Sequence, residues 1–411
     1  MNLLKKVISE NNDPNIKNSS CRYYSIDEFC SKEFQAKQLF SIFHLNIASL
    51  QFHKNDLDIL LDKLKLKFDI IAISESKLIK GVEPLHDITL PNYHIEHTPT
   101  EASKGGTLLY ISNKLNYKIR KDLEIYESKK IESTFIEIIN TTGKNVIIGC
   151  IYKHHTISPN DFSEAMSKLL IKVSKEKKPC YLAGDFNMNL LQLENKPEIE
   201  NYFDMITNQN FTPLITYPTR ITNKSKTLID NIFTNEFSSN IVSGNLTVGI
   251  SDHIPQFTLI PTNISKIKSN RSQEHRYIRK FKNIDTDDFN QDLDKIDLDP
   301  NEIEVHQYGQ NLLNVFNQVL DIHAPLTKIK PSKNDAKRNA KPWITTSILK
   351  LIKIKDKTYK TFIKEENATI KEQLFSSYKQ QKNEITKLTR KSKKIHYNEY
   401  FAKNNSNLKK L

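Results

Sequence analysis

The sequence predicts an α/β protein with a four-layer sandwich, in which helices flank two packed mixed β-sheets and a basic helical extension follows at the C-terminus. Short apolar runs of β type alternate with helical patterns from about residue 39 to residue 260. Hairpin-length connections join most of these runs and helices join only some, which favours two packed sheets over one doubly wound sheet. Beyond residue 342, lysines alternate with apolar residues at helical spacing.

Residues 38–262 are predicted to form the sandwich domain. The apolar runs that read as strands are Leu39–Leu45, Ile70–Ile73, Thr107–Ile111, Thr134–Ile139, Asn145–Tyr152, Cys180–Ala183, Leu228–Phe233, Ile241–Leu246 and Gln256–Ile260. Leucines at helical spacing between Leu57 and Leu64 predict a helix after the first strand. A second helix is expected to begin at Ser158, because serine caps helices and Pro159 suits the first turn.

Three further regions flank this domain. Residues 1–37 are polar and lack a sustained period, which predicts a poorly ordered leader with one short helix near residues 26–34. Residues 263–340 read as a helical linker and residues 341–411 as a basic helical tail. The tail holds 18 Lys and Arg against 6 Asp and Glu, whereas residues 1–340 hold 43 against 42. The basic excess therefore indicates a polyanionic partner for the tail.

Composition excludes several classes of protein. No stretch approaches the roughly 18 unbroken apolar residues of a membrane span. Polar sequence follows Met1–Lys6 where a secretory signal would need an apolar core, so an intracellular protein is expected. The four cysteines show neither zinc-type spacing nor a disulfide framework, which predicts reduced, structural thiols.

Six short polar motifs, each at the end of a predicted strand, carry the functional signal. They are His44-Leu45-Asn46, Ser74-Glu75-Ser76, Ile151-Tyr152, Gly184-Asp185-Phe186-Asn187, Leu228-Ile229-Asp230-Asn231 and Ser251-Asp252-His253. Asn, Asp and Ser also end strands simply because they favour turns, so any single motif is weak evidence. Six in one chain suit phosphodiester hydrolysis, which needs a cation, a base for water and a donor to the phosphoryl oxygens.

Individual motifs supply these chemical parts. Glu75 and Asn46 offer the oxygen ligands that a hard cation such as Mg²⁺ prefers. Asp185 and Asn187 flank Phe186, so strand-like alternation would aim both polar side chains to one side, as a base beside an amide. A turn of Asx type remains the simpler alternative for this motif.

The Ser251-Asp252-His253 run adds a candidate proton donor. Asp252, directly before His253, could fix the tautomer of the imidazole and support its cationic form. Asp230 offers a second carboxylate for orientation. A surface histidine beside a turn aspartate is the alternative.

Taken together, the motifs resemble those of the endonuclease/exonuclease/phosphatase superfamily, in particular the apurinic-type endonucleases of non-LTR (LINE-like) retrotransposons. The resemblance covers roughly residues 40–261. It implies the roles of the following residues: Asn46 and Glu75 at the metal and phosphate, Tyr152 near the scissile phosphate, Asp185 activating water with help from Asn187, Asp230 as an orienting carboxylate, and His253 paired with Asp252 as the transition-state donor.

Further segments resemble the retrotransposon branch. Residues 93–111, with a glycine turn at Lys104-Gly105-Gly106, are similar to one of its strand approaches, and residues 216–231 look like its substrate-side loop. That likeness implies that Thr219 and Arg220 bind substrate. Lys341-Pro342-Trp343-Ile344 resembles the connector to a reverse transcriptase, and no polymerase motif follows, so the chain looks truncated before that enzyme.

One departure from the family pattern lies after Tyr152, where Lys153-His154-His155-Thr156 stands in place of a proline- or asparagine-containing turn. The resemblance implies Mg²⁺, with Mn²⁺ as a substitute, and DNA as partner. It also implies element RNA on the tail, a monomeric nuclease domain and action in the nucleus. Two alternatives stay open: a phosphoesterase of the same fold that acts on abasic DNA or a small phosphoester, and a catalytically silent copy that only binds nucleic acid.

Overall fold

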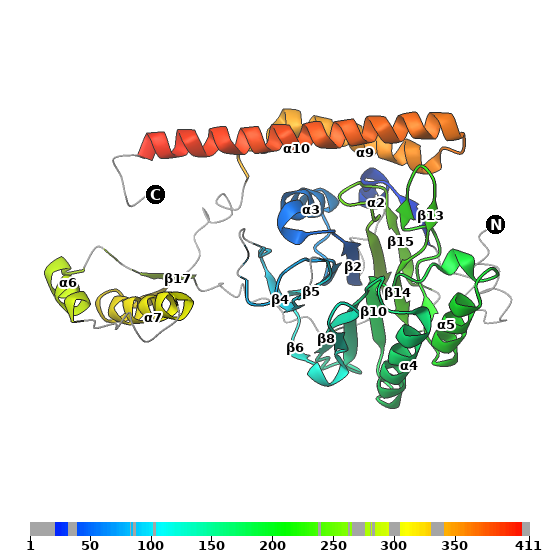
Figure 1. The fold of residues 1–411 in the computed structure, drawn as a ribbon, viewed down its shortest axis with the longest axis horizontal. Coiled ribbons are helices and arrows are strands. Elements are labelled where there is room, and N and C mark those ends of the chain that lie inside the picture. Colours follow the sequence, from blue (N-terminus) through cyan, green and yellow to red (C-terminus); the bar gives the residue numbers. More distant parts are fainter. Residues whose placement is uncertain are drawn as a thin grey trace. The chain divides into compact units, whose positions relative to one another are not determined.

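The computed structural model describes residues 21–31, 39–82, 84, 88–101, 104–236, 240–261, 264, 276–279, 281, 284–295, 305–329 and 341–404. Its chain divides into two compact units (Figure 1). The larger unit joins the residues up to 268 with those from Trp343 onward, and the smaller comprises residues 269–342. None of the helices in the described ranges is long and apolar enough to cross a membrane.

The first sheet of the larger unit has the strand order β1-β15-β16-β2-β3-β5-β4. Its members are β1 (Arg22–Tyr24), β2 (Phe40–Asn46), β3 (Ile70–Ser74), β4 (Tyr93–Thr98), β5 (Thr107–Ser112), β15 (Val242–Leu246) and β16 (Gln256–Ile260). Strands β2 and β3 are parallel, joined by helix α3 (Leu50–Leu64), while β3 and β5 are antiparallel. Mixed pairing of this kind follows from a chain that alternates helical crossovers and hairpins.

The second sheet has the order β11-β14-β10-β9-β8-β6, and β7 (Tyr126–Glu127) also pairs with β8. Its members are β6 (Tyr117–Ile119), β8 (Ile131–Ile138), β9 (Val146–Lys153), β10 (Cys180–Asp185), β11 (Thr212–Pro213) and β14 (Asp230–Thr234). Helix α4 (Pro159–Lys175) joins the parallel strands β9 and β10, and its capping serine, Ser158, accepts a hydrogen bond from the Asp161 amide. Helix α5 (Pro197–Asn208) follows β10.

Three apolar clusters define the four layers. One lies between the sheets and includes Ile42 and Leu109 of the first and Ile148 and Ala183 of the second. A second cluster joins the outer face of the first sheet to α3, and a third joins the outer face of the second sheet to α4 and α5. The predicted fold class, two mixed sheets flanked by helices with a helical C-terminal extension, is confirmed.

The N-terminal region differs from the predicted leader. Its described part, residues 21–31, contains β1, which pairs in parallel with β15, and α2 (Ile26–Ser31). Tyr24 and Phe29 are buried against the first sheet. Helix α2 lies within the short helix expected near residues 26–34. Strand β1 was not expected, because three residues are too few for a sequence period to reveal a strand. Residues 1–20 lie outside the described residues.

The smaller unit contains β17 (Arg276–Arg279), α6 (Thr286–Asp294), α7 (Val305–His323) and β18 (Leu326–Ile329). Strands β17 and β18 are antiparallel. The ring of Phe289 contacts those of Phe316 and His323, which joins α6 to α7. Helices therefore occupy much of the region read as a linker, together with a two-stranded ribbon that the sequence analysis did not predict.

The basic tail forms α9 (Thr346–Lys364) and α10 (Ala368–Asn404), which pack against each other and on the sandwich domain (Figure 1). Tyr359 and Phe362 of α9 bury their rings with Ile221 and Ile254 of the domain. The described part of the predicted basic helical tail is helical, and its apolar side chains pack on the domain. Residues 405–411 lie outside the described range.

Candidate active site

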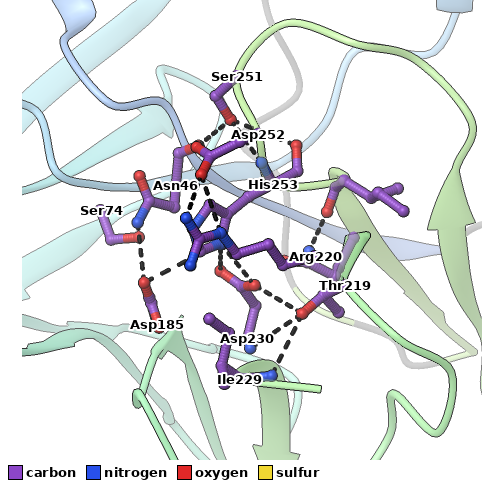
Figure 2. A network of polar contacts seen from close by, with 12 residues as sticks. Asn46, Ser74, Asp185, Thr219, Arg220, Ile229, Asp230, Ser251, Asp252 and His253 are labelled. Carbon is purple, nitrogen blue, oxygen red and sulfur yellow. Dashed lines mark hydrogen bonds and ion pairs between the residues drawn. The ribbon is translucent and has the colours of Figure 1, made fainter. Parts of the chain in front are cut away.

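Polar side chains replace apolar ones at one edge of the space between the two sheets. In β2 the inward-facing Ile42 is followed at two-residue intervals by His44 and Asn46, and in β10 Ala183 is followed by Asp185. Alternation along a strand places such residues on the same face. The inner faces of both sheets therefore bring their last residues together, and Figure 2 shows the resulting network.

Asp185 lies at the centre of this network. It stands directly opposite Asp230 in the antiparallel pair of β10 and β14, and beside Tyr152 in the parallel pair of β10 and β9. Asn46 Nδ2 donates to Asp185 Oδ2 at 2.8 Å and to Glu75 Oε1 at 3.1 Å. Burial and repulsion from Asp230 raise the pKa of the Asp185 carboxyl, although His253 and the Asn46 amide act in the opposite direction.

Glu75 reaches the network from a strained loop after β3. Its φ is 49° and that of Lys77 is 52°, a left-handed conformation that is unfavourable for residues with a Cβ. The amides of Ser76 and Lys77 donate to the carbonyls of Gly106 and Gly105 at 3.0 and 2.8 Å. The glycine turn noted in the sequence therefore holds the Glu75 loop in place.

Tyr152 joins the second sheet to Glu75. Its hydroxyl donates to Glu75 Oε1 at 3.0 Å, and burial with the neighbouring carboxylates raises the pKa of the phenol. The ring of His154 packs edge-on against Tyr152 with centroids 4.7 Å apart, and His154 Nε2 lies 3.3 Å from Glu132 Oε2. His154, one of the two histidines that stand where the family usually has a turn, thus packs against Tyr152 and supports it.

His253 is paired with Asp230. Its Nδ1 lies 2.8 Å from Asp230 Oδ2 and 3.0 Å from Oδ1, and both side chains are buried. Burial opposes a charge on the imidazole, but the Asp230 carboxylate outweighs it and raises the pKa of His253 to about 9. At neutral pH the ring is therefore a cation, and its Nε2 is available to donate.

Asp252 has a different role from the one predicted. Its Oδ2 accepts from Arg220 Nε at 2.8 Å, and no hydrogen bond to His253 is found in the described residues. The expected pairing of His253 with Asp252 is corrected to a pairing with Asp230. The chain bends at Ser251 and Asp252, and there Asp252 turns toward the half-exposed Arg220 while His253 turns inward to Asp230.

Thr219 lies behind Asp230. Its hydroxyl donates to Asp230 Oδ2 at 2.6 Å and accepts from the amides of Asp230 and Ile229 at 3.1 and 3.3 Å. The side chain is fully buried, so the hydroxyl orients the carboxylate in this structure and does not face solvent where phosphate would bind. The substrate contact expected for Thr219 is therefore corrected to a contact that supports Asp230. Thr219 directly precedes the hairpin of β12 (Arg220–Ile221) and β13 (Lys226–Thr227).

Asn187 lies close to Asp185, as the sequence predicted. The group that contacts the carboxylate is the backbone N–H of Asn187, not its side chain. Its amide N–H donates to Asp185 Oδ1 at 3.0 Å, and its side-chain Nδ2 donates to the Lys153 carbonyl. Its φ of 46° turns the chain away from strand geometry, and Phe186 is buried in the outer cluster. Both the Asx-type turn and the inward-facing aspartate are thus present.

Ser251 was part of a predicted motif without a role of its own. Its hydroxyl donates to the Asn46 carbonyl at 2.6 Å and accepts from the His253 amide at 3.1 Å. The serine thereby fixes the histidine loop to the end of β2. A second missed residue is Ser74, which contacts His44 Nε2 at 3.1 Å. Nothing in the sequence distinguishes these serines from turn residues.

The donor set fits a hard divalent cation. Glu75 and Asp185 converge on one amide nitrogen, and Asp230 adds a third carboxylate nearby. Asp185, Asp230 and His253 also offer ligand atoms within 4.8 Å of one another. The proton on His253 disfavours its Nδ1 as a ligand, so oxygen atoms form the better set. Asn46 presents Nδ2 to the carboxylates and would serve as a ligand only after its amide turned over.

Comparison with known proteins assigns the family. Residues 43–253, just over half of the chain, match the model of the endonuclease/exonuclease/phosphatase family. The chain belongs to the endonuclease/exonuclease/phosphatase family. Members of this family are hydrolases that act on phosphoester bonds, and they typically depend on a divalent metal.

Solved structures give further matches, and no curated protein does. The AP endonuclease LMAP of Leishmania major is 12% identical, with a TM-score of 0.44 over 54% of this chain and 87% of that one. The endonuclease domain of TRAS1, a telomere-specific non-LTR retrotransposon, is 13% identical, with a TM-score of 0.42 over 55% and 99%. The catalytic domain of Xenopus laevis APE2 is 15% identical, with a TM-score of 0.41 over 55% and 95%.

Proposed function

We propose that this family member is a Mg²⁺-dependent DNA endonuclease that nicks target DNA for retrotransposition. The observation that carries the proposal is the buried cluster in which Asp185, with a raised pKa, lies 4.0 Å from the cationic His253. A carboxylate whose pKa approaches neutrality is an effective general base, and a buried imidazolium is an effective donor to a developing oxyanion.

Each residue has a part in the hydrolysis. Asp185 Oδ2 accepts a proton from the water whose oxygen bonds to phosphorus, while the backbone amide of Asn187 and the side chain of Asn46 hold the carboxylate in position. The bond between phosphorus and the leaving oxygen breaks, and that oxygen takes up a proton from solvent. His253 donates from Nε2 to a phosphoryl oxygen, and Asp230 with Thr219 keeps the imidazole charged and oriented. Tyr152 holds Glu75, the main candidate ligand for Mg²⁺ or Mn²⁺. A bound cation would offset negative charge on the phosphate in the transition state.

Charge and sequence support nucleic acid as the substrate. Arg220 lies at the exposed margin of the site, and nearly all of the net charge belongs to the tail. The resemblance of residues 93–111 and 216–231 to the retrotransposon branch supports nicking of intact DNA. Action in the nucleus is part of the same proposal. The same basic tail is proposed to bind element RNA. An origin in a non-LTR retrotransposon, with the nuclease domain acting as a monomer, completes the proposal.

Nicking of supercoiled plasmid with Mg²⁺ tests the function. Asp185→Asn and His253→Gln are expected to abolish nicking, whereas Asp161→Asn, an exposed carboxyl on α4, serves as the matched control. Undiminished nicking by the two site variants would exclude this assignment of the site. Faster cleavage of an abasic duplex would instead favour repair, and cleavage of a small phosphoester alone would exclude DNA as the substrate. Salt-sensitive binding without cleavage would identify a silent copy.

A further inference from the structure

We propose that helices α9 and α10 hold the loop Gly249–Ile254 and thereby position His253, so that catalysis depends on the tail as well as on the sandwich domain. This inference rests on the proposed function, because it concerns the same site. The helices lie outside residues 43–253, the part of the chain that matches the family model. They would therefore act as positioning elements that this chain adds to the family's own site.

Two lysines anchor the start of the loop. Lys355 Nζ of α9 donates to the Gly249 carbonyl at 2.9 Å, and Lys382 Nζ of α10 donates to the Ile250 carbonyl at 2.7 Å. Lys355 is only 8% exposed. Because a buried ammonium group is unfavourable unless it is hydrogen-bonded, Lys355 is held at its carbonyl once the helices are in place, and the half-buried Lys382 adds a second contact. Two consecutive carbonyls of the loop are thus fixed from outside the domain.

Apolar contacts anchor the end of the loop. Ile254, the residue after His253, packs with Tyr359, Phe362 and Tyr378 of the two helices. A Cβ added at Gly249 would lie 2.2 Å from the Tyr378 hydroxyl, so the helix surface lies directly against the loop. This close approach explains a glycine at position 249.

The same helices support the segment that orients Asp230. Ile221 of the β12–β13 hairpin belongs to the apolar cluster that contains Ile254. The Ile254 amide donates to the Thr219 carbonyl at 2.7 Å, and Arg220 forms a β-bridge with His253. The histidine loop and the hairpin are therefore joined to each other, and both rest on the helix pair. Displacement of the helices would move His253 and Thr219 together.

Charge-matched substitutions in the full chain test the proposal. Lys355→Met and Lys382→Met remove the two anchors, while Lys357→Met and Lys387→Met remove the same charge from exposed positions on the same helices. Lysine and methionine have similar helix propensity. We expect the anchor variants to lower kcat for nicking by roughly 10- to 100-fold, the scale of a misplaced catalytic group. KM should change equally in the anchor variants and the control variants. Lys382→Arg keeps a hydrogen-bond donor, so its kcat should stay close to that of the unaltered chain.

Amide hydrogen exchange supplies a readout that needs no activity. Faster exchange confined to residues 249–254 in the anchor variants, with β9 and β10 unchanged, would support the proposal. Equal kcat in anchor and control variants, or faster exchange spread equally over β9 and β10, would overturn it. If the unaltered chain nicks no DNA, the proposed function fails, and the exchange comparison still decides whether the helices hold the loop.

Discussion

Asn46 and Asp185 end strands of different sheets, and the 2.8 Å hydrogen bond from Asn46 Nδ2 to Asp185 Oδ2 joins the two sheets at the active site. The same nitrogen also reaches Glu75. One amide therefore sets the separation between the candidate base and the candidate metal ligand. It also favours the ionised form of Asp185, because it donates to the carboxylate.

Replacement of Asn46 by alanine is expected to raise the pKa of Asp185 further. Since only the ionised carboxylate accepts a proton, the acidic limb of the kcat profile should move to higher pH, and nicking near neutral pH should fall by about 10²-fold. Measurement of kcat between about pH 5 and pH 9 checks this. An unshifted acidic limb would argue against Asp185 as the base.

Replacement of Asp230 by asparagine is expected to lower the pKa of His253 from about 9. The substitution keeps the side-chain size and removes the charge that supports the imidazolium. Nicking at about pH 8 should then be lost more completely than nicking at about pH 6, where the ring can still be protonated. NMR titration of the His253 ring measures the pKa directly, and a value that stays near 9 would contradict the pairing.

The same pair makes the stability of the fold depend on pH. The folded pKa of about 9 lies above the ordinary value of 6.5, so the contribution of His253 is complete below about pH 6.5 and is lost as pH rises through 9. Its size is about 3 kcal/mol of unfolding free energy. Urea unfolding should reveal this loss in the unaltered chain, and a weaker dependence over that range in Asp230→Asn.

Gly106→Ala is expected to weaken metal binding through the Glu75 loop. An added Cβ would lie 2.4 Å from Ser76 Oγ, and the φ of +85° disfavours alanine. The concentration of Mg²⁺ that supports half-maximal nicking should rise roughly 10- to 100-fold. Gly81→Ala is the matched control, because its φ is +75° with open space around it. The control should lose about 1 kcal/mol of stability and keep its Mg²⁺ dependence. Equal Mg²⁺ dependence in both variants would refute the supporting role of the turn.

Chelation by EDTA is expected to abolish nicking, and Mg²⁺ or Mn²⁺ should restore it. Glu75→Gln keeps the hydrogen-bonding shape and removes one negative charge, so the half-saturating Mg²⁺ concentration should rise by about 10-fold or more. Titration of Mg²⁺ into the free protein by calorimetry separates binding from catalysis. Unchanged Mg²⁺ affinity in Glu75→Gln would indicate that the metal binds instead at the group formed by Asp185, Asp230 and His253.

Thr219→Val is expected to destabilise the chain by about 1–3 kcal/mol and to lower kcat, because the Asp230 carboxylate and two amides lose their partner. Thr216→Val is the matched control. The Thr216 hydroxyl is equally buried but has no hydrogen-bond partner among the described residues, so its removal should be nearly neutral. Thermal unfolding and nicking rates compare the two, and equal effects would speak against a role for Thr219 in orienting Asp230.

Much of the sandwich could be predicted because its strands are short apolar runs that end in polar residues. The run Cys180–Ala183 leads into Asp185, and β10 indeed spans Cys180–Asp185. Alternation also places His44 and Asn46 of β2 on the inner face with Ile42, whereas the alternation predicted for Asp185 and Asn187 ends at Asp185, because Asn187 has a left-handed φ of 46°. Period-two patterns fix which face a residue occupies, so residues at the ends of such strands could be assigned to one edge.

Contacts between distant segments could not be predicted in the same way. The choice between Asp230 and Asp252 as partner of His253 depends on the direction of a loop, which no period encodes. Lys355 and Lys382 read as ordinary members of a basic helix, since the sequence does not reveal that carbonyls lie opposite them. Thr219 was predicted from resemblance alone, and its hydroxyl turned out to face a carboxylate.

The direct pairing of Asp185 with Asp230 across β10 and β14 has a consequence for how such a protein can vary. Like charges opposite each other weaken a sheet, yet here the ladder itself sets their spacing. A slip of one residue would turn one carboxylate to the far side, so the register is strictly constrained. The part of the intervening chain that contains α5 is under no such constraint, because it includes neither Asn187 nor Thr219, which bond to the two carboxylates. Its length could change while the two carboxylates keep their separation.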